Sequence, residues 1–276
     1  ARRSWAATAG IGLGDVERMI VAFHSNDGLT PRTSVVISLA DKTTDDLVAN
    51  WGPATSTGAG QTYQASEWSI FVPDSGQRRL FVMGSRQDIE DVVLNDNSPP
   101  LLRREMNWLW QSSDAQRHVS ILFEPSFLYG DGLPLFAGQR RKALDALGNF
   151  LGDGIQAVTL SMHVDRGLFW ELRIAGQLDR NPYELASQYR DKLEQLHGHV
   201  LDYIASLDTP LYWRKLAIQF PPMIGELYRH ARIGFEGDQA IVNGALPLNA
   251  AHNLVLGTEL AIHSVPEADV GGGPPM

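Results

Sequence analysis

The stretch VTLSMHVD, residues 158–165, alternates without a break between apolar and polar side chains. Successive residues of a β-strand point to opposite faces of its sheet, so this strand would bury one face and expose the other. One-sided strands of this kind belong to antiparallel sheets, whereas the strands of parallel sheets are buried on both faces. The stretch therefore predicts an α+β fold built on antiparallel sheet, with helices on one face.

A second stretch, MIVAFHSNDG at residues 19–28, has the same order of residue types as VTLSMHVDRG at residues 158–167. In each stretch an apolar or β-branched run leads to His, a short polar segment and Gly. The same spacing separates the two His residues, His24 and His163, and the two Gly residues that follow them. We interpret the stretches as equivalent strands of a duplicated structural unit, rather than as a catalytic His used twice.

The segments that follow each stretch predict the same order of elements in both halves. A second strand completes a hairpin, a helix follows, and a further hairpin and helix close the unit. The predicted ranges are 33–40, 43–52, 68–85 and 86–94 in the first half, and 168–176, 181–208, 232–245 and 249–262 in the second. We expect an additional helix within 212–231, and between the halves a helix near 101–112, a strand at 118–125 and a helix near 139–151.

This order of elements predicts two similar hairpin–helix–hairpin–helix halves, residues 17–154 and 155–262, related by a pseudo-two-fold axis within one continuous structure. The Gly-rich start of the chain, residues 1–16, is expected to be a flexible leader. The end, residues 263–276, contains a GGGPPM run and is expected to be a flexible tail.

Charge and composition exclude several classes of function. With 32 Asp and Glu against 23 Lys and Arg, the net charge is −9. Nucleic acids bind clusters of Lys and Arg, so we expect no nucleic-acid partner. The 276 residues contain no Cys, which excludes disulfides, thiolate catalysis and Cys-based zinc sites. No motif for a metal, a nucleotide or another cofactor is complete, and we predict no metal site and no cofactor.

The candidate site lies on the polar face of the VTLSMHVD strand and of the strand that folds back beside it. His163 and Asp165 share that face, and alternation places Glu171 and Arg173 on the same face of the returning strand. Four such side chains close together would suit acid–base work or a weak metal site. We favour a solvated cross-strand ladder of charges instead, because the first half repeats only His24. These five are the candidate ligand-binding residues, and we name no catalytic residue.

Three segments carry a resemblance to a known group of proteins: HVSILFEPSFL, VTLSMHVDRGLFWELRI and LPLNAAHNLVLGTEL. Their sequence pattern resembles that of bacterial extracytoplasmic α+β domains of planctomycete type, some of which are attached to membrane-spanning kinases. The resemblance covers residues from about 17 to 262. It implies an extracytoplasmic location, periplasmic or secreted, and a sensing, binding or scaffolding role. It carries over no functional residue.

We therefore expect a non-enzymatic extracytoplasmic binding, sensor or scaffold domain of a larger membrane-associated protein. Its ligand would be a protein or a small molecule, and a membrane tether would lie upstream of residue 1. One alternative is a hydrolase-type enzyme that works at the cleft between the halves, with His163, Asp165 and Glu171 as acid–base or metal groups. A second alternative is a structural subunit of a larger assembly.

Overall fold

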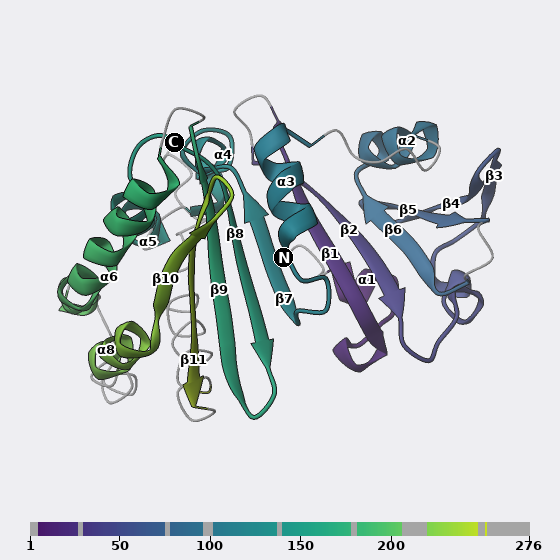
Figure 1. The fold of residues 1–276 in the computed structure, drawn as a ribbon. Helices are drawn as coiled ribbons and strands as arrows, with labels where there is room; N and C mark the ends of the chain where they lie inside the picture. The colour runs from purple at the N-terminus through teal and green to yellow at the C-terminus, as the bar shows by residue number, and fades with distance from the viewer. Residues whose placement is uncertain are drawn as a thin grey trace, which may run out of the picture. The chain divides into compact units, whose positions relative to one another are not determined.

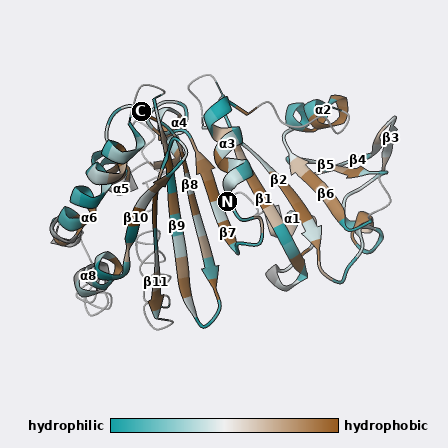
Figure 2. Cartoon of the chain, viewed as in Figure 1, coloured by the Kyte–Doolittle hydropathy of each residue, from teal (hydrophilic) through white to brown (hydrophobic). Residues whose placement is uncertain are grey.

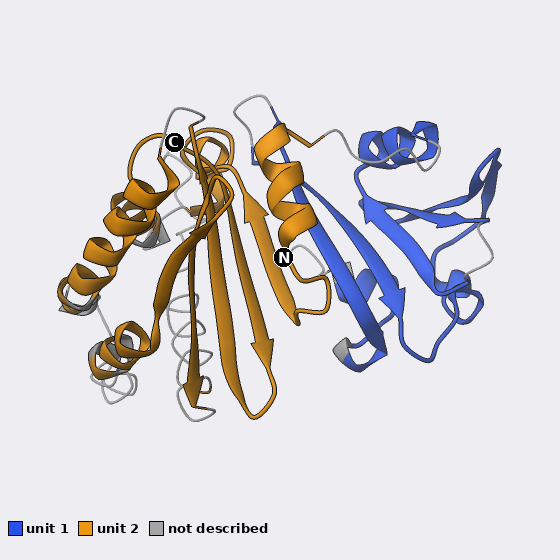
Figure 3. Cartoon of the chain, in the orientation of Figure 1, with its two compact units in different colours: residues 1–101 blue, residues 102–276 orange. Residues whose placement is uncertain are grey.

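The computed structural model describes residues 5–26, 30–74, 78–95, 102–136, 140–177, 181–205, 220–247 and 252 (Figure 1). The chain divides into two compact units, residues 1–101 and residues 102–276 (Figure 3). Each unit contains one antiparallel sheet together with helices, which confirms the predicted α+β class. Hydrophobic residues follow the strands of both sheets, while the helices are striped with hydrophilic ones (Figure 2).

The first unit is built on a six-stranded antiparallel sheet with the order β1-β2-β6-β5-β4-β3. Short helical elements precede it and interrupt it, and one α-helix closes it. The elements are α1 (Trp5–Ala9), η1 (Leu13–Asp15), β1 (Val16–His24), β2 (Arg32–Leu39), η2 (Thr44–Asp46), η3 (Val48–Asn50), β3 (Thr55–Thr57), β4 (Gly60–Ala65), β5 (Trp68–Pro73), β6 (Leu80–Gly84) and α2 (Arg86–Leu94).

Trp51 lies in the middle of the core of the first unit and is fully buried. Its ring centroid lies 5.6 Å from that of Tyr63 and 5.0 Å from that of Phe81. Its indole Nε1 donates a hydrogen bond of 3.1 Å to the carbonyl oxygen of Ala9. Ala9 and Ile11 belong to the same buried cluster. Residues 5–16 are therefore part of the folded unit, which corrects the prediction of a flexible leader over this range.

The helix predicted at 43–52 is absent, and two short 3₁₀ turns, η2 and η3, take its place. Thr43 precedes η2, and the Asp46 carboxylate accepts hydrogen bonds from both the backbone N–H and the hydroxyl of Thr43. The segment ends at Gly52, which has a φ of +86°. So few residues between a cap and a left-handed Gly give little support for an α-helix, and 3₁₀ geometry is common in such short pieces.

The second unit is built on a five-stranded antiparallel sheet with the order β10-β11-β9-β8-β7. Its elements begin with a helix, and the predicted helices and strands between the halves all belong to it. The elements are α3 (Arg104–Ser112), β7 (Val119–Phe123), α4 (Pro125–Tyr129), η4 (Leu133–Phe136), α5 (Arg140–Leu151), β8 (Ile155–Val164), β9 (Gly167–Gly176), α6 (Pro182–Ala205), α8 (Phe220–His230), β10 (Arg232–Glu236) and β11 (Gln239–Pro247).

The side chains of β8 alternate between the two faces of the second sheet as predicted, but the polar face is not the exposed one, because Thr159 and Ser161 are each only 2% exposed. Val158, Trp170 and Ile174 lie on one face and pack against residues of α5 and α6, among them the fully buried Tyr189. The opposite face is polar over most of its length. It is covered at one end by α3, whose Leu109 packs on Ala157 of β8 and Ala175 of β9. The helices of this unit therefore cover both faces, and the prediction of helices on one face holds for α5 and α6 but not for α3.

The sequence predicted a boundary between the halves after residue 154. The boundary between the two units instead falls after residue 101. The reason is that α3 and β7 pack on the second sheet, where β7 pairs with β8. The predicted closing helix at 249–262, apart from His252, and the predicted tail at 263–276 lie outside the described residues.

Both sheets contain two hairpins joined in the same way. The order β1-β2-β6-β5 in the first unit corresponds to β8-β9-β11-β10 in the second, since in each case the second strands of the two hairpins are neighbours. His24 ends β1, and His163 lies in β8, the first strand of its own hairpin. The units differ after the first hairpin, where the first has 3₁₀ turns and two extra strands and the second has the long helix α6. The pseudo-two-fold duplication stays a prediction.

Candidate functional site on the polar face of the second sheet

The register of β8 and β9 brings the predicted polar residues onto one face of the second sheet. Ser161 lies opposite Glu171, and His163 lies opposite Phe169. Directly opposite residues of an antiparallel pair share a face, so Arg173, two residues after Glu171, lies there as well. Alternation in the sequence therefore predicted the shared face of His163, Glu171 and Arg173 correctly.

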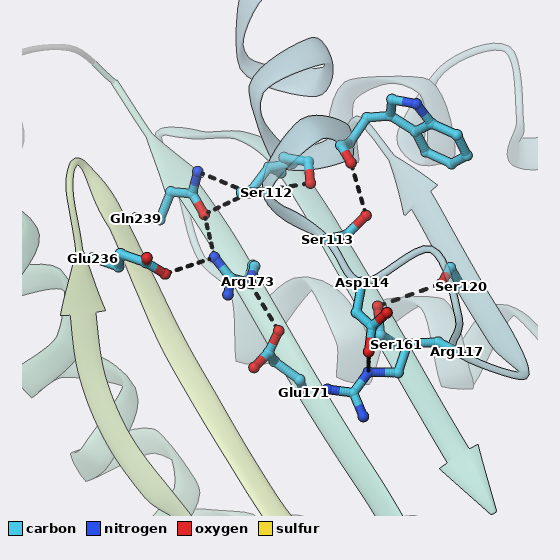
Figure 4. A network of polar contacts seen from close by, with 12 residues as sticks. Ser112, Ser113, Asp114, Arg117, Ser120, Ser161, Glu171, Arg173, Glu236 and Gln239 are labelled. Atoms are coloured by element: carbon cyan, nitrogen blue, oxygen red, sulfur yellow. Dashed lines mark hydrogen bonds and ion pairs between the residues drawn. The ribbon is translucent and has the colours of Figure 1, made fainter.

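Arg173 is the centre of the polar network (Figure 4). Its Nε donates a hydrogen bond of 2.8 Å to Glu171 Oε1, and its Nη1 donates one of 3.0 Å to Glu236 Oε2. The side chains of Arg173 and Glu171 are each only 13% exposed. Burial alone would lower the pKa of Arg173, but the hydrogen bonds and charges of Glu171 and Glu236 outweigh it, so the pKa is raised. The guanidinium is therefore a permanent cation held between two carboxylates.

The network continues from Arg173 to the C-terminal end of α3. Arg173 Nη1 also lies 3.4 Å from Oε1 of Gln239, a buried residue at the start of β11. The Gln239 amide nitrogen donates a hydrogen bond of 3.3 Å to the Ser112 hydroxyl oxygen. Ser112 in turn donates to the Leu109 carbonyl within α3. These contacts fix the end of α3 on the polar face of the sheet.

A second group of side chains lies farther along the same face, around His163. The ring of His163 stacks on that of His118, with centroids 4.2 Å apart and planes 18° from parallel. His118 Nδ1 accepts a hydrogen bond of 3.0 Å from the backbone N–H of Val164. Because Nδ1 is the acceptor, His118 carries its ring hydrogen on Nε2. Arg117 lies over the ring of Phe169, 4.3 Å from its centroid.

His118 is a residue of this face that the candidate list lacks. A sequence signal for it exists, since the polar residues His118 and Ser120 alternate with the apolar residues Val119 and Ile121 in the segment HVSILFEP. The register of β7 on β8 confirms the alternation, because Val119 lies opposite Met162. What the sequence does not give is the neighbour of β7 in the sheet.

The other two candidate residues are not part of this network. Asp165 is an exposed residue of the hairpin turn, where its backbone N–H donates to the Gly167 carbonyl. Its side chain makes no hydrogen bond or ion pair with any described residue. His24 belongs to the first unit, where its Nε2 lies 2.7 Å from the hydroxyl oxygen of Ser34.

The geometry gives no support to an acid–base mechanism at these residues. Glu171 is held by Arg173, and within the described ranges no hydrogen bond or ion pair joins His163 to Glu171 or Asp165. Nor do any three His, Asp or Glu side chains of the described residues cluster closely enough to hold a metal ion. The predicted solvated ladder of charges is wrong for Arg173 and Glu171, whose side chains are largely buried. We interpret the network around Arg173 as a structural contact between α3 and the sheet.

The substitution Arg173→Met is expected to lower the free energy of unfolding by about 2–3 kcal/mol, because it leaves the largely buried Glu171 carboxylate without its cation. Urea denaturation followed by circular dichroism measures this loss. Adding Glu171→Gln removes the unpaired charge and is expected to recover about 1 kcal/mol. Arg141→Met is the matched control, since its ion pair with Asp145 is exposed and worth less than about 1 kcal/mol. Equal losses in the two Arg variants would contradict a structural role for Arg173.

A second feature, the apolar outer strand of the first sheet, was not predicted as a site. Met19, Val21 and Phe23 of β1 are 41%, 40% and 47% exposed. Met19 and Val21 lie opposite the buried core residues Ile37 and Val35 of β2, so the apolar face of the core continues onto β1 without a cover. Monomeric proteins seldom leave a row of apolar side chains in water, and such rows mark interaction surfaces.

The backbone of β1 is also free on one side. β1 is an end strand of its sheet, so one side of its backbone has no strand partner among the residues that the structure describes. Its middle segment MIVAF contains no charge, Pro or Gly, the residues with which proteins protect open edges. In the second unit the end strand β7 has a similar but shorter row, with Val119 and Ile121 exposed.

Comparisons with known proteins give little further information. No protein-family model matches the chain, and no curated protein matches its sequence. Among solved structures, the chain is similar to TP0453 in its crystal form I, with 12% sequence identity and a TM-score of 0.40. The match covers 87% of this chain and 78% of TP0453. A TM-score of this size does not establish a shared fold. None of the helices in the described ranges has the length and apolar character needed to span a membrane.

Proposed function

We propose that this chain is a binding or scaffold domain that takes up an extended protein segment along β1. The observation that carries the proposal is the row of Met19, Val21 and Phe23, exposed on an open strand edge. A segment added there would form backbone hydrogen bonds to the free edge, and its alternate side chains would cover the apolar row. Both contributions arise from one strand, so no separate pocket is needed.

The location that we propose for this activity is outside the cytoplasm, in a larger membrane-associated protein. The resemblance of HVSILFEPSFL and VTLSMHVDRGLFWELRI to extracytoplasmic bacterial domains supports it. The sequence without Cys is compatible with an oxidising compartment. Accessibility of the full-length protein to protease added to spheroplasts, which lack the outer-membrane barrier, tests the location, and protection of the domain while the cytoplasmic membrane is intact would contradict it.

The role of β1 can be tested with a designed strand. The probe is a fluorescein-labelled peptide, KTVTVTVTK, whose binding is followed by fluorescence anisotropy at protein concentrations where sedimentation shows a monomer. Saturable binding is expected for the wild type. The substitution Val21→Lys is expected to weaken it about tenfold or more, because it places a charge in the middle of the apolar row.

The control for Val21→Lys is Val92→Lys in the same unit. Val92 is 38% exposed on α2, close to the 40% of Val21, but it lies on no strand edge. Its substitution is expected to leave peptide binding unchanged. Absence of saturable binding to the wild-type monomer, or equal weakening by the two Lys substitutions, would overturn the proposed function.

We also infer that the two sheets arose from a duplicated unit, with His24 and His163 in equivalent strands. The shared order of β1-β2-β6-β5 and β8-β9-β11-β10 supports this. The two His residues have different partners, Ser34 and His118, as expected if the duplication preserved a strand rather than a chemical site. An experimental structure in which these strands fail to superpose in this order would contradict the duplication.

A further inference from the structure

We infer that the segment taken up by β1 is β1 of a second copy of this chain, so that two copies pair edge to edge and antiparallel about Val21. The inference rests on the proposed function, because it requires β1 to be a docking edge. It goes beyond that function in naming the partner, the direction of the added strand and its register.

The register follows from the regular part of β1. The pairing of β1 with β2 is irregular between Val16 and Arg18, and it is regular from Arg18 to His24. The midpoint of this regular part is Val21. A two-fold axis through Val21 and perpendicular to the sheet places Met19 opposite Phe23 of the second copy and Val21 opposite itself.

This register matches like faces. Met19, Val21 and Phe23 stay on the same face in both copies, so the two exposed rows merge into one apolar band that continues from the core residues Ile37 and Val35. A shift of the register by one residue would instead pair Met19, Val21 and Phe23 with residues that belong to the other face of the second copy, since side chains alternate with a period of two. On the other face, Ile20 meets Ala22 of the second copy.

The charges at the ends of β1 are compatible with this pairing. Glu17 lies at the irregularity, outside the regular part of the strand. Arg18 would lie opposite His24 of the second copy. In each copy, His24 Nε2 lies 2.7 Å from the hydroxyl oxygen of Ser34 on the neighbouring strand β2. No two carboxylates and no two Lys or Arg side chains face each other directly in the paired segment. The strand therefore matches itself in apolar pattern without bringing two fixed like charges together, and on this ground we name a second copy as its partner.

The wild-type sequence contains no Cys, so a single introduced Cys reports the register directly. In the inferred pairing, Val21→Cys faces its own copy, and Cα atoms of directly opposite residues lie about 4.5–5.5 Å apart, within the range of a disulfide. Ile20→Cys is the matched control, since it is a neighbouring exposed residue of the same strand. Its own copy would lie diagonally, at roughly 7–8 Å, beyond disulfide distance.

Under mild oxidation, Val21→Cys is expected to form a covalent dimer on non-reducing gels about ten times faster than Ile20→Cys, since its sulfur atoms need no backbone movement to meet. Sedimentation equilibrium of the wild type is expected to show a dimer at tens of micromolar, with Val21→Lys monomeric and Val92→Lys still dimeric. Equal cross-linking of the two Cys variants would overturn the register. A wild type that remains monomeric up to about 100 µM would overturn the pairing, because its free energy of association would then be weaker than about −5.5 kcal/mol.

The two proposals fail in different ways. A monomeric wild type that binds the KTVTVTVTK peptide through β1 would overturn the self-pairing and leave the proposed function in place. A monomeric wild type that does not bind the peptide would overturn both. A wild-type dimer whose two Cys variants cross-link equally, and which Val21→Lys does not dissociate, would place the contact elsewhere on the chain and overturn the self-pairing of β1.

Discussion

Replacing Trp51 by Ala is expected to lower the free energy of unfolding by about 3–5 kcal/mol, the largest loss for any single side chain of the first unit. Trp51 is fully buried, and its ring packs against those of Tyr63 and Phe81. The substitution leaves a cavity between these rings and removes the donor for the Ala9 carbonyl, which is itself buried. Urea denaturation followed by far-ultraviolet circular dichroism measures the loss.

Trp110→Ala is the control for Trp51→Ala, because it is the same substitution at an exposed position on α3. A change below about 1 kcal/mol is expected there, since surface substitutions seldom cost more. Hydrogen exchange should locate the effect of Trp51→Ala in the first unit, with faster exchange of the amides of β2 and β6. A loss no larger than that of Trp110→Ala would show that Trp51 is not central to the core.

Tyr189→Ala is expected to cost a similar amount, about 3–5 kcal/mol, in the second unit. Tyr189 is fully buried in α6, and its ring centroid lies 5.5 Å from that of Phe150. Its hydroxyl donates a hydrogen bond of 2.8 Å to the Leu151 carbonyl at the end of α5. The side chain therefore joins the two helices to each other and to the apolar face of the sheet.

The contributions of the ring and of the hydroxyl can be separated. Tyr189→Phe keeps the ring and is expected to cost about 1–2 kcal/mol, because the Leu151 carbonyl loses its donor in a buried site. Tyr183→Ala, in the first turn of the same helix, is the exposed control and is expected to cost under about 1 kcal/mol. A Tyr189→Ala variant no less stable than Tyr183→Ala would contradict the packing of α6 on the sheet.

The sequence predicts local features of this fold well. Alternation in VTLSMHVD correctly predicted which residues of β8 share a face, because side chains alternate along a strand with a period of two. It did not predict that the polar residues Thr159 and Ser161 would be buried. The start of α6 was also correct, since the Asn181 side chain accepts a hydrogen bond from the Tyr183 N–H as a capping residue should. Both features depend only on residues that are close together in the chain.

The errors lie where distant segments determine local structure. The leader was predicted flexible from its Gly residues, but Trp51 binds Ala9 from 42 positions away in the chain. The strands β3 and β4 were not predicted, because their sequence is polar and they are strands only through the pairing of β4 with β5 and of β3 with β4. The contacts of Arg173 with Glu236 and Gln239 likewise depend on which strands are neighbours in the sheet.

The shortness of the end strands β3, β7 and β10 limits the number of copies in any assembly built on strand edges. An isologous pair at β1 alone closes after two copies, whereas a second self-pairing edge on the same chain would link dimer to dimer into an open-ended filament. β3 has three residues and β7 and β10 have five each, against nine residues in β1. A strand this short is one of the devices by which proteins prevent an edge from pairing. Growth would therefore stop at two copies, and lengthening the apolar row of β7 would be the change that turns a closed dimer into a fibre.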